Sequence, residues 1–183
     1  MKKQVKPPSD PIKIYVQAEQ FRFADAVLRR DPRMNSSPEY FSYVGIPSIV
    51  LSAFASELYL KCLLALEGKD VPKTHNLKTI FKRLRGKTQN RLTDRWTTYL
   101  KTTEDGIRLV NKYENYDASD LLTVLADGSN TFDEIRYSFE RTPKTEFVIS
   151  NLPWLIRDEI LDLKPEWKTT GPKVTVSIRS PIR

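Results

Sequence analysis

The segment that most constrains the fold of this chain runs from about Pro47 to Leu66. Its apolar side chains cover more than one face of a helix, and they include Ile49, Val50, Leu51, Phe54, Leu58, Leu60, Leu63 and Leu64. A helix that is apolar nearly all round has to be surrounded by other elements. We therefore predict a central core helix, which stops at Gly68 because glycine readily takes the conformation that ends a helix.

Other segments supply helices that can pack around this core. Helical spacing of apolar residues, together with capping residues and Gly or Pro stops, predicts helices over residues 10–30, 74–86, 88–113, 119–126, 131–141 and 154–163. Asp10 and Thr74 are the predicted N-caps of the first two, and Gly106 is expected to break or bend the third. Residues 31–45, rich in Pro, Asn and Ser, predict a loop. Residues 147–149 predict a short strand, and residues 174–178 an edge strand or an extended arm.

The length of 183 residues suits one domain, and 39% hydrophobic with 29% charged residues is typical of a folded chain. Helices joined by short turns predict an all-α fold, an up-and-down four- or five-helix bundle with short extra elements and an extended C-terminal arm. We expect three parts: a flexible basic arm at 1–11, the helical domain at 12–163 and a basic C-terminal extension at 164–183.

Several classes of protein are disfavoured by the composition. No run approaches the ~18 consecutive apolar residues of a membrane-spanning helix, and the basic N-terminus has no apolar stretch behind it. Cys62 is the only cysteine and is expected to be a small buried hydrophobe, whereas His75 is the only histidine. We therefore expect a cytoplasmic protein without a metal site or cofactor, and no standard hydrolase or nucleotide-dependent enzyme is visible.

The net charge of +7 is segregated along the chain. Residues 78–101 hold eight basic residues against Asp94 alone, whereas residues 102–163 hold thirteen acids against six bases. Such a segment can contact phosphates, and the candidates for nucleic-acid binding are Lys78, Lys82, Arg83, Arg85, Lys87, Arg91 and Arg95. Trp96 and Tyr99 could then stack on bases, although both also fit the core stripe of their helix. The alternative is an ordinary solvated face of a helix.

One set of residues carries a family resemblance. Glu57 and Lys61 lie one turn apart on the core helix, Thr74-His75-Asn76-Leu77 follows the turn after Gly68, and Arg136-Tyr137 comes late in the chain. In these positions the sequence, over roughly residues 46–140, resembles the HEPN superfamily. The resemblance implies a helical bundle, usually a homodimer, often linked to RNA. It also implies that partners can include a nucleotidyltransferase or an antitoxin, and that many members are metal-independent ribonucleases.

The chain departs from the pattern of the active members, in which an Arg is followed after four to six residues by a His. Arg136 matches the Arg, but residues 137–143 contain no His. A metal-independent ribonuclease needs a group that moves protons, a task that imidazole performs near neutral pH and guanidinium does not. His75 is then the remaining catalytic candidate beside Arg136. Its alternative is a structural role, with a hydrogen bond made locally or to Glu57.

Glu57 and Lys61, together with Tyr137, are interpreted as structural residues of the family motif. The first two are expected to form an ion pair or to anchor the next helix. Three functions stay open at this point: an RNA-associated HEPN-like protein without efficient catalysis, in a defence or toxin–antitoxin setting; a ribonuclease with a site around Arg136 and His75; or a non-enzymatic module that binds a protein.

Overall fold

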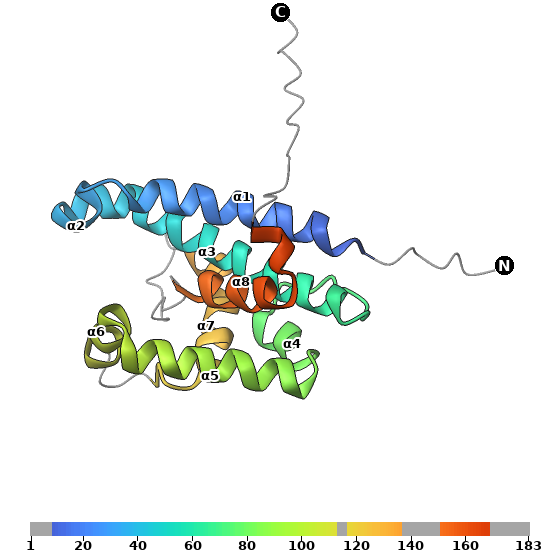
Figure 1. Ribbon diagram of the computed structural model, residues 1–183. Helices are drawn as coiled ribbons and strands as arrows, with labels where there is room; N and C mark the ends of the chain where they lie inside the picture. The colour runs from blue at the N-terminus through green and yellow to red at the C-terminus, as the bar shows by residue number, and fades with distance from the viewer. Residues whose placement is uncertain (1–8, 113–116, 137–150, 169–183) are drawn as a thin grey trace, which may run out of the picture.

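The computed structural model describes residues 9–112, 117–136 and 151–168, and these residues contain helices but no strand (Figure 1). The all-α helical bundle predicted from the sequence is therefore confirmed. The elements in chain order are α1 (Pro11–Arg29), α2 (Arg33–Ser36), α3 (Pro38–Leu66), α4 (Leu77–Lys82), α5 (Gly86–Thr102), α6 (Glu104–Lys112), α7 (Leu121–Arg136), α8 (Leu152–Leu163) and the short 3₁₀ helix η2 (Pro165–Lys168). The predicted strands at 147–149 and 174–178, and the C-terminal arm, lie outside the described residues.

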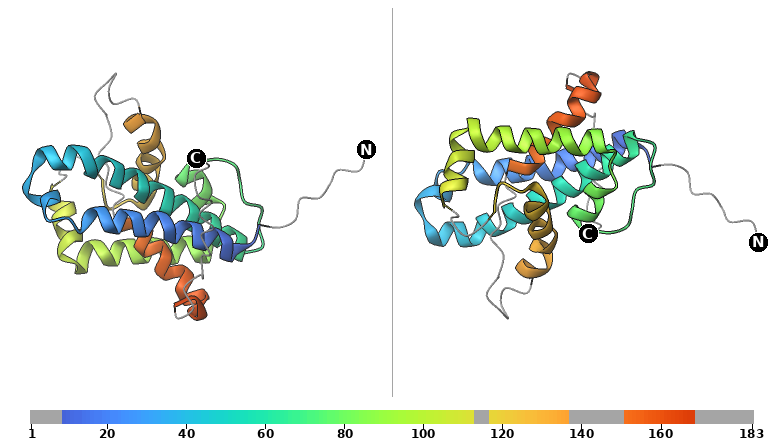
Figure 2. Two further views of the ribbon diagram at one scale, coloured as in Figure 1. Left: turned by 90° about the horizontal axis from the view of Figure 1, so that it is seen from above. Right: turned by 90° about the horizontal axis from the view of Figure 1, so that it is seen from below.

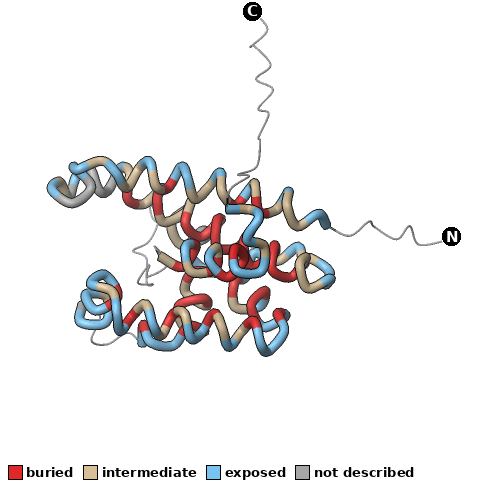
Figure 3. The backbone as a smooth tube through the Cα atoms, viewed as in Figure 1, coloured by how far each residue is buried: buried red, intermediate tan, exposed pale blue. Residues whose placement is uncertain are grey.

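Helix α3 is the centre of the bundle, as its composition predicts. It packs against α1 along its length and against α4, α7 and α8, and α7 and α8 extend on opposite sides of it (Figure 2). Buried residues gather where α3, α7 and α8 meet and along one face of α5 (Figure 3). Residues Tyr43–Leu66 are long and apolar enough to cross a membrane, but a core helix passes the same test. The packing of other helices around α3 is that of a core helix.

Two polar clusters fasten α1 to α3. The buried carboxylate of Asp25 accepts hydrogen bonds from the hydroxyls of Ser48 and Ser52, and Arg29 donates to it from one turn along α1. Further along, Glu19 accepts from Tyr59 on α3. The carboxylates of Asp25 and Glu19 thus have partners on α3, which fixes the register of α1 on α3 more narrowly than apolar contacts alone. Cys62, by contrast, is a buried small side chain as predicted, and burial raises the pKa of its thiol to about 12.

The predicted loop at 31–45 is wrong, because most of this segment is helical. It contains α2 and the first turns of α3, which begins at Pro38 and continues through Pro47. Proline suits the first turn of a helix, but inside a helix it removes the bond to the carbonyl four residues earlier. Here that carbonyl belongs to Tyr43, and both Tyr43 and Pro47 are exposed. The lost bond therefore falls on the solvent side, where water can replace it.

The helix predicted at 74–86 is shorter than expected and has a different cap. Asn76, and not Thr74, is the N-cap of α4, and its side chain accepts from the amide of Thr79 at 2.7 Å. The Thr74 hydroxyl instead accepts from the Asn76 amide at 3.1 Å and orders the preceding turn. Gly86, expected to end this helix, begins α5.

Two glycines were assigned the wrong role. The break predicted at Gly106 falls at Thr103, whose hydroxyl accepts from the Gly106 amide at 3.0 Å. Gly106 is needed for close packing, since a Cβ there would lie 2.2 Å from the carbonyl oxygen of Tyr99. Gly128 does not separate two helices but lies buried inside the single helix α7. Both glycines lower helix propensity, and at Gly106 the close approach to the backbone of α5 explains why glycine is needed.

At the C-terminal end of the described residues, α8 and η2 contact α1. Helix α8 spans residues 152–163, close to the predicted 154–163, and Arg157 on it donates to Glu19 of α1 at 2.8 Å. After α8, Trp167 of η2 packs against the ring of Tyr15, with ring centroids 5.0 Å apart. A residue of the predicted C-terminal extension thus contributes to the core of the helical domain.

Candidate functional site

Glu57 lies at the centre of the first candidate site. Its carboxylate is 9% exposed on α3 and accepts from the ammonium of Lys61, one turn further along, at 2.7 Å. Nδ1 of His75 lies 3.1 Å from both carboxylate oxygens. The imidazole itself is 78% exposed. The structure therefore contains both the ion pair and the Glu57–His75 contact expected from the sequence, and the contact joins a buried carboxylate to a ring at the surface.

The Glu57 carboxylate orients the His75 ring. In a neutral imidazole one nitrogen donates and the other accepts, and the carboxylate selects the tautomer with its proton on Nδ1. Nε2 then remains as an acceptor of hydrogen bonds or protons. This is the arrangement in which a carboxylate orients an imidazole that acts as a base.

The turn that carries His75 is anchored to α7. The amide of Leu77 donates to the hydroxyl of Ser129 at 2.8 Å, and that hydroxyl donates to the carbonyl of Leu125 at 2.6 Å. With the Thr74 and Asn76 bonds on either side of it, the imidazole has a defined position. Sequence analysis missed Ser129. A small polar residue beside Gly128 on a buried helix face was the available indication.

A cavity of about 370 Å³ lies beside this pair. Val50, Ala53 and Phe54 of α3 form one wall, and Leu77 and Gly128 contribute to the rest of the apolar lining. Glu57, His75 and Ser129 are the polar residues of its lining. An apolar cavity with a few converging polar groups is the usual form of a small-ligand site. Within the described ranges, no three His, Cys, Asp or Glu side chains gather as a metal would require.

Arg136, the other catalytic candidate, is the last residue of α7. Its side chain and the whole of Tyr137 lie outside the described part of the chain. Along the helix axis, Arg136 follows Ser129 by seven residues, which places its backbone about 10 Å from that of Ser129. The fold therefore places Glu57, Lys61 and His75 together, with Arg136 further along a helix that borders the same cavity.

Of the basic segment, Arg91 and Arg95 on α5 make contacts inside the protein. Both pair with Glu159 of α8, whose carboxylate is 1% exposed, at 2.5 Å for Arg91 and 3.2 Å for Arg95. Arg95 also pairs with Asp162 one turn further along α8. We call these four residues the α5–α8 ion-pair cluster. It compensates a buried carboxylate and holds α5 against α8.

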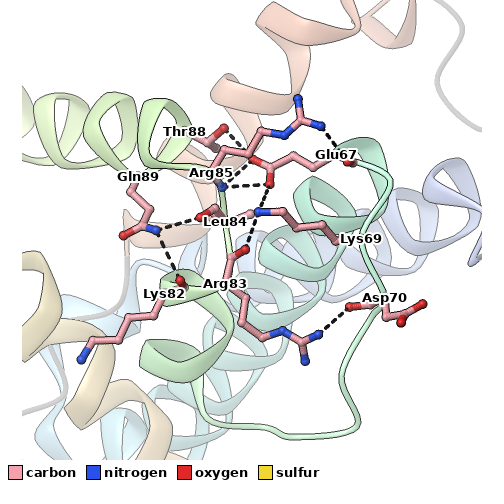
Figure 4. Close-up of polar contacts among 9 residues, drawn as sticks. All are labelled: Glu67, Lys69, Asp70, Lys82, Arg83, Leu84, Arg85, Thr88 and Gln89. Atoms are coloured by element: carbon pink, nitrogen blue, oxygen red, sulfur yellow. Dashed lines mark hydrogen bonds and ion pairs between the residues drawn. The ribbon is translucent and has the colours of Figure 1, made fainter.

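Glu67 organises the turn between α4 and α5 (Figure 4). Its carboxylate accepts from the Arg85 amide at 2.9 Å and the Thr88 hydroxyl at 2.7 Å, and it pairs with Lys69 at 2.8 Å. Burial alone would raise the pKa of Glu67, but the hydrogen bonds from Lys69, Thr88 and the Arg85 amide outweigh burial and lower it. The end of α3 thereby caps the first turn of α5 with a negative charge.

Side chains around this turn also bind backbone carbonyls. Lys69 donates to the Arg83 carbonyl at 2.6 Å, and Arg85 donates to the Glu67 carbonyl at 3.1 Å. Gln89 donates to the Leu84 carbonyl at 2.8 Å. These bonds are drawn in Figure 4, where the ammonium of Lys82 points away from the other labelled residues. The turn is thus held from inside, and its remaining cations face outward.

We call Lys78, Lys82, Arg83, Arg85 and Lys87 the basic corner. All but Lys78 are exposed, and Lys78 is half-buried. Among the described residues, none of the five forms an ion pair with a carboxylate within 4.0 Å, so their charges are not neutralised by a direct partner. The structure thus separates the seven predicted nucleic-acid-binding residues into the five of the basic corner and the two of the α5–α8 ion-pair cluster.

The aromatic residues near the basic segment belong to the core. Trp96 is buried, and its indole N–H donates to the Ala118 carbonyl at 2.8 Å. The hydroxyl of Tyr99 accepts from Asn151 at 2.6 Å, and its ring packs on Trp96. The core interpretation of Trp96 is therefore correct, and its indole is not available for stacking on bases.

These features define an all-α bundle in which a buried carboxylate on the core helix holds an exposed imidazole beside a cavity. A comparison with family profiles matches residues 48–142, just over half of the chain, to the HEPN domain. The chain therefore belongs to the HEPN domain family. The matched region contains Glu57, Lys61, His75 and Arg136, whereas α1 and α8 lie outside it. Searches of the curated proteins and of the solved structures found no match.

Proposed function

We propose that this HEPN-domain protein binds RNA as a homodimer, without efficient catalysis, in a defence or toxin–antitoxin setting. The observation that supports RNA binding most directly is the basic corner. Its five cations come from α4, the turn that follows it and the first turn of α5, and none has a carboxylate partner within salt-bridge distance among the described residues. Cations of this kind release counterions from nucleic acid when they contact phosphates, which produces affinity that depends steeply on salt and little on sequence.

The absence of efficient catalysis is proposed from the sequence around Arg136. No His follows it within four to six residues, so the imidazole used by active HEPN ribonucleases has no counterpart there. His75 is the only imidazole of the chain, and it is positioned by Glu57 at the cavity. Arginine can stabilise charge on a phosphate, but it stays protonated and cannot accept the proton of a 2′-hydroxyl.

A second candidate function is metal-independent cleavage of RNA, with His75 as the proton-transfer group and Arg136 as the group that stabilises phosphate charge. One observation favours it: the Glu57 carboxylate lies 3.1 Å from Nδ1 of an exposed imidazole. The carboxylate fixes the orientation of the His75 ring and leaves Nε2 as the acceptor, and the exposure of the ring makes it accessible to RNA.

The test is an RNA cleavage time course with purified protein in EDTA, which suppresses contaminating metal-dependent nucleases. Wild type, Arg136→Ala and His75→Ala are compared, and RNA affinity is measured for each at two salt concentrations. We expect intact RNA in all three, with similar, salt-sensitive affinities. Cleavage by the wild type that is lost in both variants would establish the ribonuclease instead.

Absence of RNA binding even at low salt would contradict both candidates and leave a protein-binding module. The homodimer is tested separately by light scattering of the purified protein, where a mass near twice 21.2 kDa is expected. A mass of one chain at micromolar concentration would contradict the dimer without affecting the test of RNA binding.

A further inference from the structure

We infer that the cavity beside Glu57 binds a guanine-type ring, a planar base with adjacent N–H donors on one edge. The inference rests on the proposed RNA association for the source of the ring, which would be an unpaired guanosine of an RNA strand. A free guanine nucleoside presents the same chemistry, and the experiment below separates the two sources.

The dimensions and lining of the cavity suit a planar aromatic ligand. Its volume of about 370 Å³ lies at the lower end of the roughly 300–1,000 Å³ range in which proteins hold small ligands. Val50, Ala53 and Phe54 present apolar surface from one helix, and Leu77 adds to it. An unstacked base loses the contact of its neighbours, and apolar and aromatic side chains can replace that contact.

Among the described residues, the polar side chains of the lining can accept hydrogen bonds but have no free donor. The Glu57 carboxylate receives Lys61 and His75, and a carboxylate has about four acceptor positions, so about two remain. The Ser129 hydroxyl gives its proton to the Leu125 carbonyl and receives the Leu77 amide, which leaves one lone pair. With Nδ1–H of His75 directed at Glu57, Nε2 is also an acceptor. A ligand matched to this set has to supply the donors.

Among the RNA bases, guanine fits such acceptors best. Its N1–H and its exocyclic amine are adjacent donors on one edge, and together they match the two oxygens of a carboxylate. Adenine and cytosine place a ring acceptor beside their amine, and uracil places its single N–H between two carbonyls. Those acceptors would face the carboxylate oxygens, and unpaired acceptors in a partly enclosed site are costly.

The basic corner begins directly after Leu77, a residue of the cavity lining, so we expect its cations to contact the phosphates of a bound RNA strand. The polypeptide leaves the rim of the cavity at Leu77 and continues directly into α4, which carries Lys78 and Lys82. Base contacts at the cavity would add sequence preference to the sequence-independent affinity of the phosphate contacts.

The experiment measures binding of the full-length protein to single-stranded oligouridine, eleven nucleotides long, that carries one central guanosine, inosine or adenosine. Inosine is the matched control, because it differs from guanosine only by the missing exocyclic amine. We expect the guanosine strand to bind about 10-fold tighter than the inosine strand. Equal affinities for these two strands would overturn the inference.

Two variants link the preference to the cavity. Glu57→Gln replaces one acceptor oxygen with an amide NH₂ donor, and it should abolish the preference for guanosine over inosine. Val50→Phe narrows the apolar part without changing Glu57, and it should lower the affinity for the guanosine strand to that of plain oligouridine. Far-ultraviolet circular dichroism confirms folding of each, and a folded Val50→Phe variant with full preference would overturn the inference.

Free guanosine and inosine, titrated by calorimetry, separate this inference from the proposed function. Binding of guanosine but not of inosine, in the absence of binding to any strand, would support the cavity and contradict RNA association. Strands that bind equally well, with no binding of free guanosine, would support RNA association and overturn the guanine site.

Discussion

The cations of the basic corner and the two arginines of the α5–α8 ion-pair cluster lie within twenty residues of each other in the chain, yet their charges differ in role. Arg91 and Arg95 contact a carboxylate of α8 that is almost completely buried. Lys82 and Lys87 are exposed, with no carboxylate within salt-bridge distance in the described part of the chain. A positively charged side chain is thus available to a ligand only where it is not already paired with a carboxylate inside the protein.

The difference follows from the cost of burying a charge. Glu159 is desolvated, and without its arginines it would be an uncompensated buried charge. Moving Arg91 or Arg95 to a phosphate would therefore destabilise the bundle. Lys82 and Lys87 lose only water and counterions when they bind, so the same contact is favourable for them.

The largest expected effect comes from breaking the ion-pair cluster. Glu159→Gln leaves two arginines without a buried negative partner and should lower the free energy of unfolding by about 3 kcal/mol. Urea denaturation followed by circular dichroism measures it. Asp162→Asn is the matched control, because Asp162 pairs with Arg95 at the surface and should cost less than about 1 kcal/mol. Equal losses in both variants would show that Glu159 does not organise the cluster.

Neutralising the basic corner tests the other half of the comparison, the charges that remain available to a ligand. The triple variant Lys82→Gln, Arg83→Gln and Lys87→Gln should weaken single-stranded RNA binding about 100-fold at 0.1 M salt and reduce the salt slope by about 2. Its free energy of unfolding should change by less than about 0.5 kcal/mol. Fluorescence anisotropy over a salt series measures the first, and urea denaturation the second.

The control for the corner is a triple variant with the same change in net charge. Lys13, Lys101 and Lys168 are exposed and lie on α1, near the end of α5 and on η2. Their replacement by Gln should weaken RNA binding much less than the corner variant does. If the two triple variants bind RNA equally, the total charge of the protein, and not the corner, determines affinity.

The smallest expected effect concerns Glu67, whose carboxylate holds the turn of the basic corner in place. Because its pKa is lowered in the folded protein, Glu67 stabilises the fold above its unfolded pKa of about 4.3. That contribution is lost as the pH falls through the folded pKa. Glu67→Gln should therefore cost about 1 kcal/mol near pH 7, and the difference from wild type should shrink below pH 4. Urea denaturation at pH 7, 5 and 3 tests this, and a constant difference would contradict it.

Much of the fold could be predicted because it follows from local patterns. The all-round apolar segment 47–66 predicts the core helix, and Asp10 followed by Pro11 predicts the start of α1, where the Asp10 side chain accepts from the Ile12 amide. Leu77, Ile80 and Phe81 predict the buried face of α4. Caps and apolar periodicity act over one or two turns, and this is the range over which a sequence can be interpreted directly.

The errors occurred where tertiary contacts override local preference. Gly128 is buried inside the continuous helix α7, and Gly106 is required by the Tyr99 carbonyl rather than by a bend. Residues 31–45 were predicted as a loop, but α1 packs along α3 and supports helix from Pro38 onward. Propensity is a weak prior, and packing outweighs it when a segment is covered by a partner helix.

The sequence by itself determined the helical class, the core helix, the family motif around Glu57 and His75, and the excess of positive charge in 78–101. Only the tertiary structure decided which positive charges remain available to a ligand. That depends on Glu159, which is far from Arg91 and Arg95 in the chain, and on Glu67, which follows α3 and accepts from the Arg85 amide. The tertiary structure also decided that Ser129 and Gly128 meet the Glu57–His75 pair at a cavity. Periodicity determines which face of a helix is buried, but the identity of the neighbours across that face depends on how distant segments pack.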